Sequence, residues 1–433
     1  MNKKFLGFCC TAVLFGAALP IWAAFADTPT EPVAVLSAHL LGKGSADRSY
    51  DQNGDSILNG FDLALARQAA VTTQTNTTET TMGITTEITT ETTAETTGTT
   101  EETTVTTTAA PDGAVRLVEV SDIDQLLQAL ADAQPGDDIV LAEGIYQLSE
   151  SAGPKGSLFY TRAEGTAEQP ITIRSADPEH PALLCGTDAA SHYVLYLTGD
   201  WWRVQDLKIS TGQKGIMLDN SNYSRITRCE VYDIGSEGIH FRDDSSYCTA
   251  EDCYVHDTGT VTPAYGEAVY VGSAKSTSGY GYSCDYNTIM GCRLGPNVGA
   301  EHVDIKEYTT GTVVAECIFD GTGMSGENYA DSFVDIQGND CVIRDNVGYR
   351  NGCGNITAAI QMHVLVDGWG FDAQVYGNRM YMDIAENPGG RPMYLLDGWY
   401  NTATVWDNWI AYEDGSLFAA TEEQYNLESY TMQ

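Results

Sequence analysis

Carboxylate and basic side chains recur at alternate positions of short strands in the second half of the chain. Alternate residues of a strand point to opposite faces, so these side chains share one outward face; they are Arg242, Asp304, Lys306, Asp335 and His363. Together such groups suit the removal of a proton next to a carboxylate, where one group neutralises the carboxylate and a base takes the proton. Lys306 is the candidate base. Asp304 and Asp335 flank it, and their charges raise its pKa unless calcium takes them up.

Each of these residues also has a purely structural interpretation. Aspartates at turns commonly form side-chain ladders or cap backbone groups, which would account for Asp304 and Asp335. Lys306 would then only form salt bridges, and His363 would be an ordinary exposed polar residue. The group that assists the base is also open, with Arg242, Arg344 and His363 as the candidates.

The elements that position these residues follow from a repeat between Trp202 and Trp409, in which β-branched runs end in Cys or Asn at one fixed place. Those places are Cys229, Cys253, Cys292, Cys317, Asn346, Asn378 and Asn408, at spacings of 24 to 39 residues. Each period holds a second short strand, as in AVYVG (268–272) and VDIKE (303–307). Two or three strands per period predict a mainly β protein, a parallel β-helix. The four cysteines are then expected to stack as buried thiols.

The β-helix module is predicted to span residues 112–433 and to begin with a cap. Residues 123–133 have the pattern of an amphipathic helix, and Pro135-Gly136 turns the chain into a strand at 138–141. A cap of this kind is needed because the first coil of a solenoid would otherwise expose its core.

This N-terminal run, continued by GTAEQPITIRS (165–175), resembles the start of pectate-lyase-like β-helix proteins, including the chondroitinase B and alginate lyase type. The segment EHVDIK (301–306) is similar to the part of that type where a calcium-ligating Glu precedes the catalytic Lys by five residues. The resemblance implies a right-handed β-helix, with Glu301 as a calcium ligand and Lys306 as the base.

On this resemblance we expect a calcium-assisted lyase that cleaves an acidic, uronate-containing plant cell-wall polysaccharide such as pectin by β-elimination. Two alternatives remain at this point. One is a β-helix glycoside hydrolase that uses paired carboxylates. The other is a non-catalytic carbohydrate-binding or adhesive β-helix protein, because one fold hosts many functions.

The chain is strongly acidic, with a formal net charge of −38 over 433 residues. After residue 110, Asp and Glu outnumber Lys and Arg by 48 to 17. This charge argues against nucleic-acid binding, which needs basic surface. It also provides many oxygen ligands for hard cations such as calcium.

The first 26 residues read as a signal peptide. Lys3 and Lys4 precede an apolar stretch at 5–24, and Ala24-Phe25-Ala26 provides a small-x-small cleavage site. We therefore expect a secreted, extracellular protein. No later stretch is long and apolar enough to suggest a membrane span.

Residues 51–62, DQNGDSILNGFD, have the spacing of an EF-hand calcium loop. The expected ligands are Asp51, Asn53, Asp55, the carbonyl of Ile57, Asn59 and Asp62. With flanking helical patterns, the small α-helical segment 33–71 resembles a dockerin, the cohesin-binding module of cellulosomal enzymes. The resemblance implies a cohesin domain of a scaffold protein as partner, and a place at the cell surface or in a cellulosome.

Residues 72–111 form a predicted disordered linker. Between Thr72 and Thr108 there are 22 Thr and 6 Glu in 37 residues, and no basic or aromatic residue. Such a composition cannot bury enough apolar surface to fold. A dockerin-like segment, a tether and a large β module in this order match the layout of a cell-wall enzyme delivered to a scaffold.

Overall fold

The computed structural model describes residues 115–427 and 429–432. The predicted signal peptide, dockerin-like segment and Thr-rich linker lie outside these residues. So do the expected calcium ligands Asp51, Asn53, Asp55, Ile57, Asn59 and Asp62.

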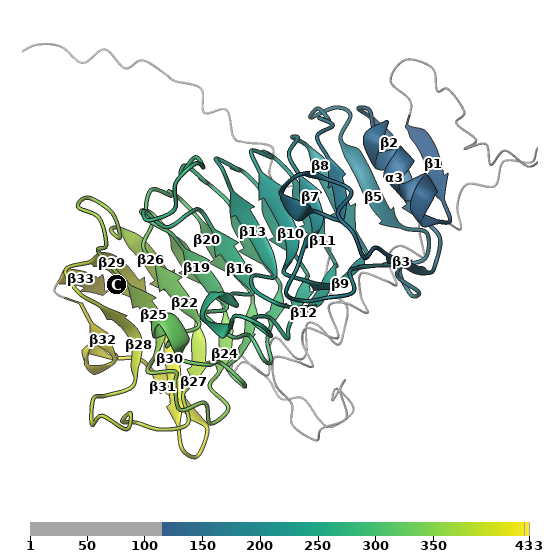
Figure 1. Cartoon of the computed structure of the whole chain (residues 1–433). Coiled ribbons are helices and arrows are strands. Elements are labelled where there is room, and N and C mark those ends of the chain that lie inside the picture. Colours follow the sequence, from purple (N-terminus) through teal and green to yellow (C-terminus); the bar gives the residue numbers. More distant parts are fainter. Residues whose placement is uncertain (1–114, 428, 433) are drawn as a thin grey trace, which may run out of the picture. The chain divides into compact units, whose positions relative to one another are not determined.

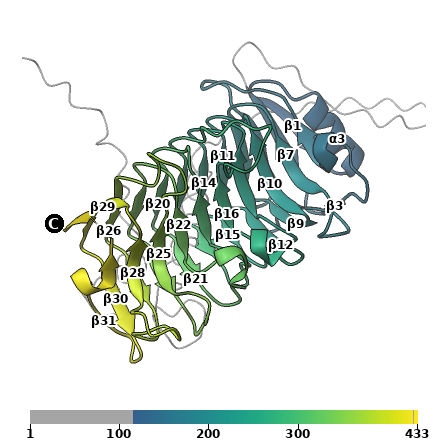
Figure 2. The same cartoon turned by 60° about the vertical axis from the view of Figure 1, so that its left-hand side comes forward.

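The described part of the chain coils into three long sheets whose strands stack along one axis (Figures 1 and 2). Each full coil contributes one strand to each sheet, and neighbouring strands pair in parallel. The predicted mainly β, right-handed parallel β-helix is confirmed.

Sheet A holds twelve of the described strands. In spatial order they are β1 (Arg116–Val120), β2 (Asp137–Leu141), β5 (Ile171–Ser175), β8 (Trp202–Gln205), β11 (Arg225–Thr227), β14 (Thr249–Glu251), β17 (Thr288–Met290), β20 (Val313–Ala315), β23 (Val342–Arg344), β26 (Ala373–Tyr376), β29 (Thr402–Trp406) and β33 (Ser429–Met432).

Sheet B holds eleven of the described strands. They are β3 (Ile145–Gln147), β6 (Leu183–Cys185), β9 (Lys208–Gly212), β12 (Glu230–Ile234), β15 (Tyr254–Val255), β18 (Arg293–Leu294), β21 (Ile318–Asp320), β24 (Val347–Tyr349), β27 (Arg379–Tyr381), β30 (Trp409–Tyr412) and β31 (Ser416–Ala419). The last pair, β30 and β31, is antiparallel.

Sheet C holds ten of the described strands and carries the candidate site. They are β4 (Phe159–Thr161), β7 (Tyr193–Leu197), β10 (Lys214–Asp219), β13 (Ile239–Arg242), β16 (Val269–Val271), β19 (Val303–Ile305), β22 (Val334–Ile336), β25 (Ala358–Met362), β28 (Tyr394–Gly398) and β32 (Tyr425–Asn426). Short 3-10 helices lie between strands at η3 (Pro154–Gly156), η4 (Pro263–Tyr265), η5 (Glu327–Tyr329) and η6 (Glu422–Gln424).

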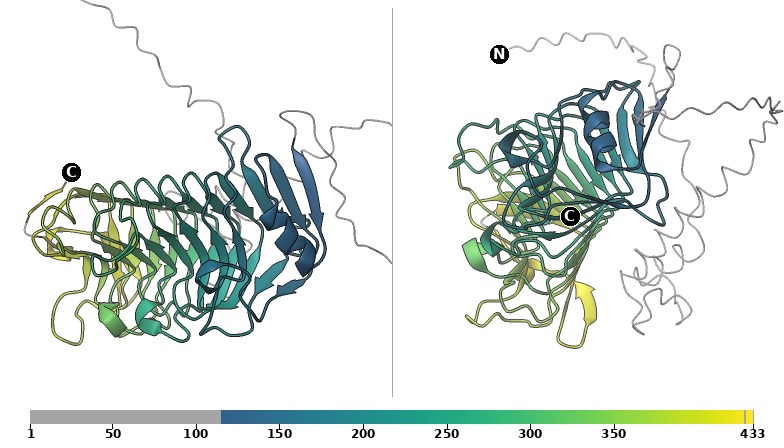
Figure 3. Two further views of the ribbon diagram at one scale, coloured as in Figure 1. Left: turned by 45° about the horizontal axis from the view of Figure 1, so that its top comes forward. Right: turned by 45° about the vertical axis from the view of Figure 1, so that its right-hand side comes forward.

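Helix α3 (Ile123–Ala131) lies beside β1 and β2 at one end of the solenoid, as the left panel of Figure 3 shows. Asp122 begins the helix by accepting a hydrogen bond from the backbone N–H of Gln125. Leu126 and Leu130 are buried against the first coils. The predicted cap helix is thus present and ends two residues earlier than expected.

The predicted column of cysteines and asparagines lies at the corner between sheets A and B. Cys229, Cys253, Cys292 and Cys317 are buried free thiols, which confirms the expectation that they stack without disulfides. The column continues as an asparagine ladder, in which the side-chain N–H of Asn346 donates to Oδ1 of Asn378 at 3.0 Å.

The residue before each column position has a left-handed backbone, with φ between 50° and 68°. These residues are Arg228, Asp252, Gly291, Glu316, Asp345, Gly377 and Asp407. This conformation turns the chain sharply from one sheet to the next. Asp and Gly are frequent there because they tolerate positive φ better than most residues.

Among the described residues, no helix has the length and apolar character needed to cross a membrane.

Candidate active site

Strand pairing on sheet C places the candidate residues of successive coils next to one another on one face. Asp304 pairs with Tyr270 on one side and with Asp335 on the other, and Asp335 pairs with Gln361. Adjacent strands are about 4.8 Å apart, so groups on successive coils are close enough to interact. The predicted register of this face is confirmed.

The side chains of this face point out of the coil, but several of them are covered by other segments. Asp304, Asp335 and Arg242 are 3%, 8% and 5% exposed. Segments that leave the strands fold back over the sheet: the backbone N–H of Lys275, after β16, donates to Glu307 at 2.6 Å. The acidic groups therefore lie in a partly enclosed setting, where charges interact more strongly than in water.

Lys306 follows β19 directly and points toward carboxylate and aromatic neighbours. Its Nζ lies 2.7 Å from Oδ2 of Asp304 and 5.4 Å from the ring centroid of Tyr270. Burial lowers the pKa of Lys306, but the charge of Asp304 and its other neighbours outweighs burial and raises the pKa overall. The Lys306 side chain keeps 14% of its surface exposed, so it is accessible to a ligand.

Glu267, Glu301 and Asp304 form a buried carboxylate cluster. One oxygen of each lies within 4.8 Å of an oxygen of the others. Oε2 of Glu267 and Oδ1 of Asp304 are buried without a hydrogen-bond partner. Burial, together with repulsion from neighbouring carboxylates inside and outside the cluster, raises the pKa of Glu267 and Glu301 well above the usual range and that of Asp304 to about 6.

This cluster fits a hard divalent cation. Carboxylate oxygens are the ligands that calcium and magnesium take in proteins. Three buried carboxyl groups with two orphaned oxygens are unfavourable without a positive partner, because a buried unpaired polar atom costs free energy. Glu301, expected as a calcium ligand from the sequence, belongs to this set.

Asp335 and His363 extend the site to the next two coils. Oδ1 of Asp335 lies 3.3 Å from Nε2 of His363, and its Oδ2 accepts a hydrogen bond from Gln337 at 2.7 Å. Nε2 of His363 also lies 3.0 Å from Oε1 of Gln361. The structure therefore brings together Glu301, Asp304, Lys306, Asp335 and His363.

Arg242 and Arg344 are not part of this group. Arg242 lies two strands before Lys306 and binds both oxygens of Asp219, at 2.7 and 2.8 Å. Arg344 lies on β23 of sheet A, where it pairs with Glu316 and Asp345. Of the three candidates for the assisting group, His363 is the one that contacts a residue of this group, Asp335.

Sequence reasoning missed two residues of the site, Glu267 and Tyr270. Glu267 precedes Tyr270 by three residues, as Glu301 precedes Asp304 and Glu237 precedes His240. This recurring spacing of a glutamate before each strand position was the available signal. The Tyr270 ring stands next to both Asp304 and Lys306.

A family model described as "Pel9A-like, right handed beta helix region" matches residues 88–327, which is more than half of the chain. The chain therefore belongs to the Pel9A-like right-handed β-helix family.

The chain is also similar to solved structures. The chain is similar to an alginate lyase from Paenibacillus sp. str. FPU-7, with 43% identity and a TM-score of 0.64 over 73% of this chain and 97% of that chain. It also matches pectate lyase Pel9A, with 14% identity and a TM-score of 0.48 over 67% of this chain and 72% of that chain. A search of curated proteins found no match.

The fold, the family match and the similarity to the alginate lyase define a polysaccharide-lyase-like β-helix protein, and they support polysaccharide degradation.

Proposed function

We propose that the protein cleaves a uronate-containing polysaccharide by β-elimination, with Lys306 as the base. The observation that carries the proposal is the placement of Lys306 between Asp304 and Tyr270, beside a buried carboxylate cluster. The 43% identity to an alginate lyase over nearly all of that protein supports the same reaction class.

In this reaction the neutral amine of Lys306 removes the proton from the carbon that bears the uronate carboxyl group. Lys306 takes this neutral form only when the charge of Asp304, which raises its pKa, is offset. The electron pair forms a double bond to the neighbouring carbon, whose bond to the glycosidic oxygen breaks. The hydroxyl of Tyr270 then donates a proton to that oxygen, so one product carries an unsaturated uronate and the other a new hydroxyl group. Burial raises the pKa of Tyr270 well above its usual range, which keeps this hydroxyl protonated until the transfer.

Glu267, Glu301 and Asp304 are the residues that would hold a calcium ion in this module. When bound, calcium would neutralise the substrate carboxylate and offset the negative charge beside Lys306. Asp335 and His363 lie one and two coils further along sheet C and would position the sugar units that follow the cleaved bond.

The sequence suggested pectin as the substrate, and pectin remains a prediction. The name of the 43% identical relative favours alginate as the first polymer to test. Both are chains of uronates, so the chemistry proposed for Lys306 applies to either.

We propose the roles of the N-terminal segments from their sequence. The signal peptide, the dockerin-like calcium loop and the Thr-rich tether would export the module and attach it to a cohesin-bearing scaffold.

The test is ultraviolet absorbance of unsaturated uronates after the full chain is incubated with alginate, pectate and glycosaminoglycans. We expect absorbance to rise with at least one uronate polymer. New reducing ends without this absorbance would instead indicate a hydrolase. No cleavage of any of these polymers would indicate a binding protein.

A further inference from the structure

Basic residues gather along sheet C although the module is strongly acidic. The described residues contain five lysines, and four of them lie on sheet C or on segments that touch it: Lys155, Lys214, Lys275 and Lys306. Lys155 pairs with Asp219 of β10, Lys214 belongs to β10, and the backbone N–H of Lys275 donates to Glu307 beside β19. Four of the five lysines thus share the face that carries the candidate site, where an accessible cation can bind an anionic ligand.

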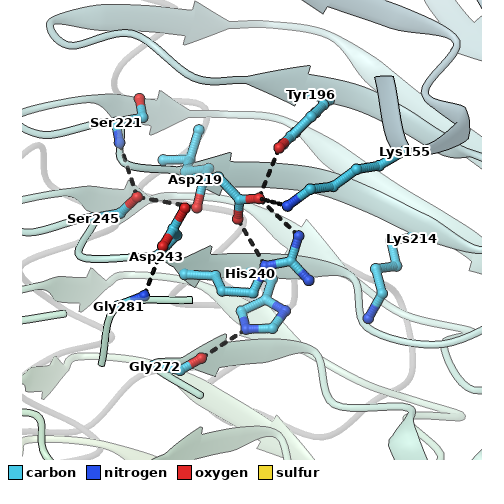
Figure 4. A network of polar contacts seen from close by, with 12 residues as sticks. Lys155, Tyr196, Lys214, Asp219, Ser221, His240, Asp243, Ser245, Gly272 and Gly281 are labelled. Atoms are coloured by element: carbon cyan, nitrogen blue, oxygen red, sulfur yellow. Dashed lines mark hydrogen bonds and ion pairs between the residues drawn. The ribbon is translucent and has the colours of Figure 1, made fainter. Parts of the chain in front are cut away.

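Lys155 belongs to a network of polar contacts around Asp219, shown in Figure 4. The Arg242 strand of this network lies two strands before that of Lys306. Lys155 and Tyr196 converge on Oδ2 of Asp219, at 3.0 and 2.8 Å. Arg242 binds both oxygens of the same carboxylate. Two cations share one carboxylate, so the group keeps net positive charge.

Aromatic rings enclose these cations. The ring centroid of Tyr280 lies 4.0 Å from Cζ of Arg242 and 4.2 Å from Nζ of Lys155. Tyr280 is held in place because Asp243 accepts a hydrogen bond from the backbone N–H of Gly281 at 2.6 Å. Cations beside aromatic rings form a setting suited to a sugar that carries a carboxylate.

The Lys155 side chain is 36% exposed, whereas Arg242 is almost buried. Lys155 is therefore the cation that reaches a ligand, and Asp219 and Arg242 hold it in position. Lys214, 13% exposed and paired with Glu237, lies near the ring of Tyr193, which is also next to Arg242.

The network and Lys306 share one row of sheet C. Arg242 and Lys306 are separated in this row by Gly272 alone, since β13 pairs with β16 and β16 with β19. Two strand spacings amount to about 10 Å, a distance that a single sugar ring does not span. Gly272 places no side chain between them.

We propose that Lys155, Arg242 and Tyr280 form a distal subsite for the carboxylate of a uronate unit remote from the bond that is cleaved. This inference rests on the proposed function and deepens it. The polymer then runs along sheet C parallel to the solenoid axis, and longer chains bind more tightly than short ones because they reach Lys155.

The test compares Lys155→Met with Lys208→Met. Lys208 is a matched control because its side chain is 39% exposed and pairs with Glu230 at 2.7 Å, but on sheet B. The KM of each full-length protein is measured with alginate and galacturonate oligomers of increasing length. Loss of one charged contact is expected to raise KM about tenfold for long oligomers. The effect should shrink as the oligomers shorten, Lys155→Arg should restore most of the affinity, and Lys208→Met should change nothing.

A KM change that is equal at every length, or absent in Lys155→Met, would overturn the subsite. If the wild-type protein forms no unsaturated product, binding of the same oligomers measured by calorimetry still tests the subsite. If the oligomers bind the wild type and bind Lys155→Met more weakly, the subsite is supported and only the proposed reaction is contradicted. No binding to the wild type overturns both.

Discussion

Nζ of Lys306 lies 2.7 Å from Oδ2 of Asp304, and the two side chains leave the same turn of the solenoid two residues apart. The other oxygen of Asp304 is buried without a hydrogen-bond partner, and Asp304 belongs to the carboxylate cluster with Glu267 and Glu301. Asp304 therefore connects the candidate base to the candidate cation site, so each should influence the other.

Calcium is expected to stabilise the β-helix module through this cluster. A ligand at a hundred times its Kd stabilises a folded protein by about 2.7 kcal/mol, which corresponds to a rise of several degrees in Tm. Glu301→Gln should remove this part of the calcium-dependent rise in thermal unfolding. Asp55→Ala, in the N-terminal loop, is the control that leaves it in place. A calcium-dependent rise of undiminished size in Glu301→Gln would rule the cluster out as a calcium site.

The pair His256 and Glu230 on sheet B should make stability depend on pH. Burial lowers the pKa of His256, but hydrogen bonds with Glu230 and Asp257 raise it overall. The hydrogen bond with His256, with further help from Lys208, overcomes burial and lowers the pKa of Glu230 to about 2.

The direction of each pKa shift determines the pH range in which that group stabilises the fold. The raised pKa of His256 stabilises the fold below its ordinary value of about 6.5, and this contribution is lost as pH rises through the folded pKa. The lowered pKa of Glu230 stabilises the fold above about 4.3, and this contribution is lost as pH falls toward 2. His256→Gln should therefore lower Tm more at about pH 5.5 than at about pH 9. An equal loss at both values would show that the pair contributes only by packing.

The asparagine ladder should matter more for stability than the cysteine part of the same column. Asn378 donates to the carbonyl of Ile343 and to Oδ1 of Asn408, each at 2.9 Å, and accepts from Asn346. Asn378→Ala leaves these buried groups unpaired, and we expect a loss of about 2–4 kcal/mol in the free energy of unfolding. Cys292→Ala removes only a small apolar group and should cost about 1–2 kcal/mol. Denaturant unfolding measures both, and equal losses would contradict a hydrogen-bonding role for the ladder.

Much of the fold was predictable because the repeat is local. The spacing of the Cys and Asn positions predicted which strands stack. Alternation within VDIKE (303–307) and VDIQG (334–338) placed Asp304, Lys306 and Asp335 on one face of adjacent coils, as the structure has them. The cap helix followed from its own amphipathic pattern and differed only at its last two residues.

The remaining features depend on packing between distant segments. Asp219, the partner of Arg242, went unnoticed because its strand carries Met217 where the later coils carry polar residues. Glu267 lies before strand β16, so the alternation of side chains along a strand does not predict which way its side chain points. The burial of Asp304 and Asp335 was not predictable either, because the path of a segment such as that of Lys275, which bonds to Glu307, is not encoded in the repeat.

The central claim is that Lys306 performs the chemistry, and one comparison of kcat tests it most directly. Lys306→Met and Lys208→Met are assayed for unsaturated products on the polymer that the wild type cleaves, with thermal unfolding to confirm that both fold. Loss of a general base typically lowers turnover by about 10²–10⁴-fold, so we predict a loss of this size in Lys306→Met and turnover close to the wild type in Lys208→Met. A folded Lys306→Met protein that retains wild-type turnover would contradict the account.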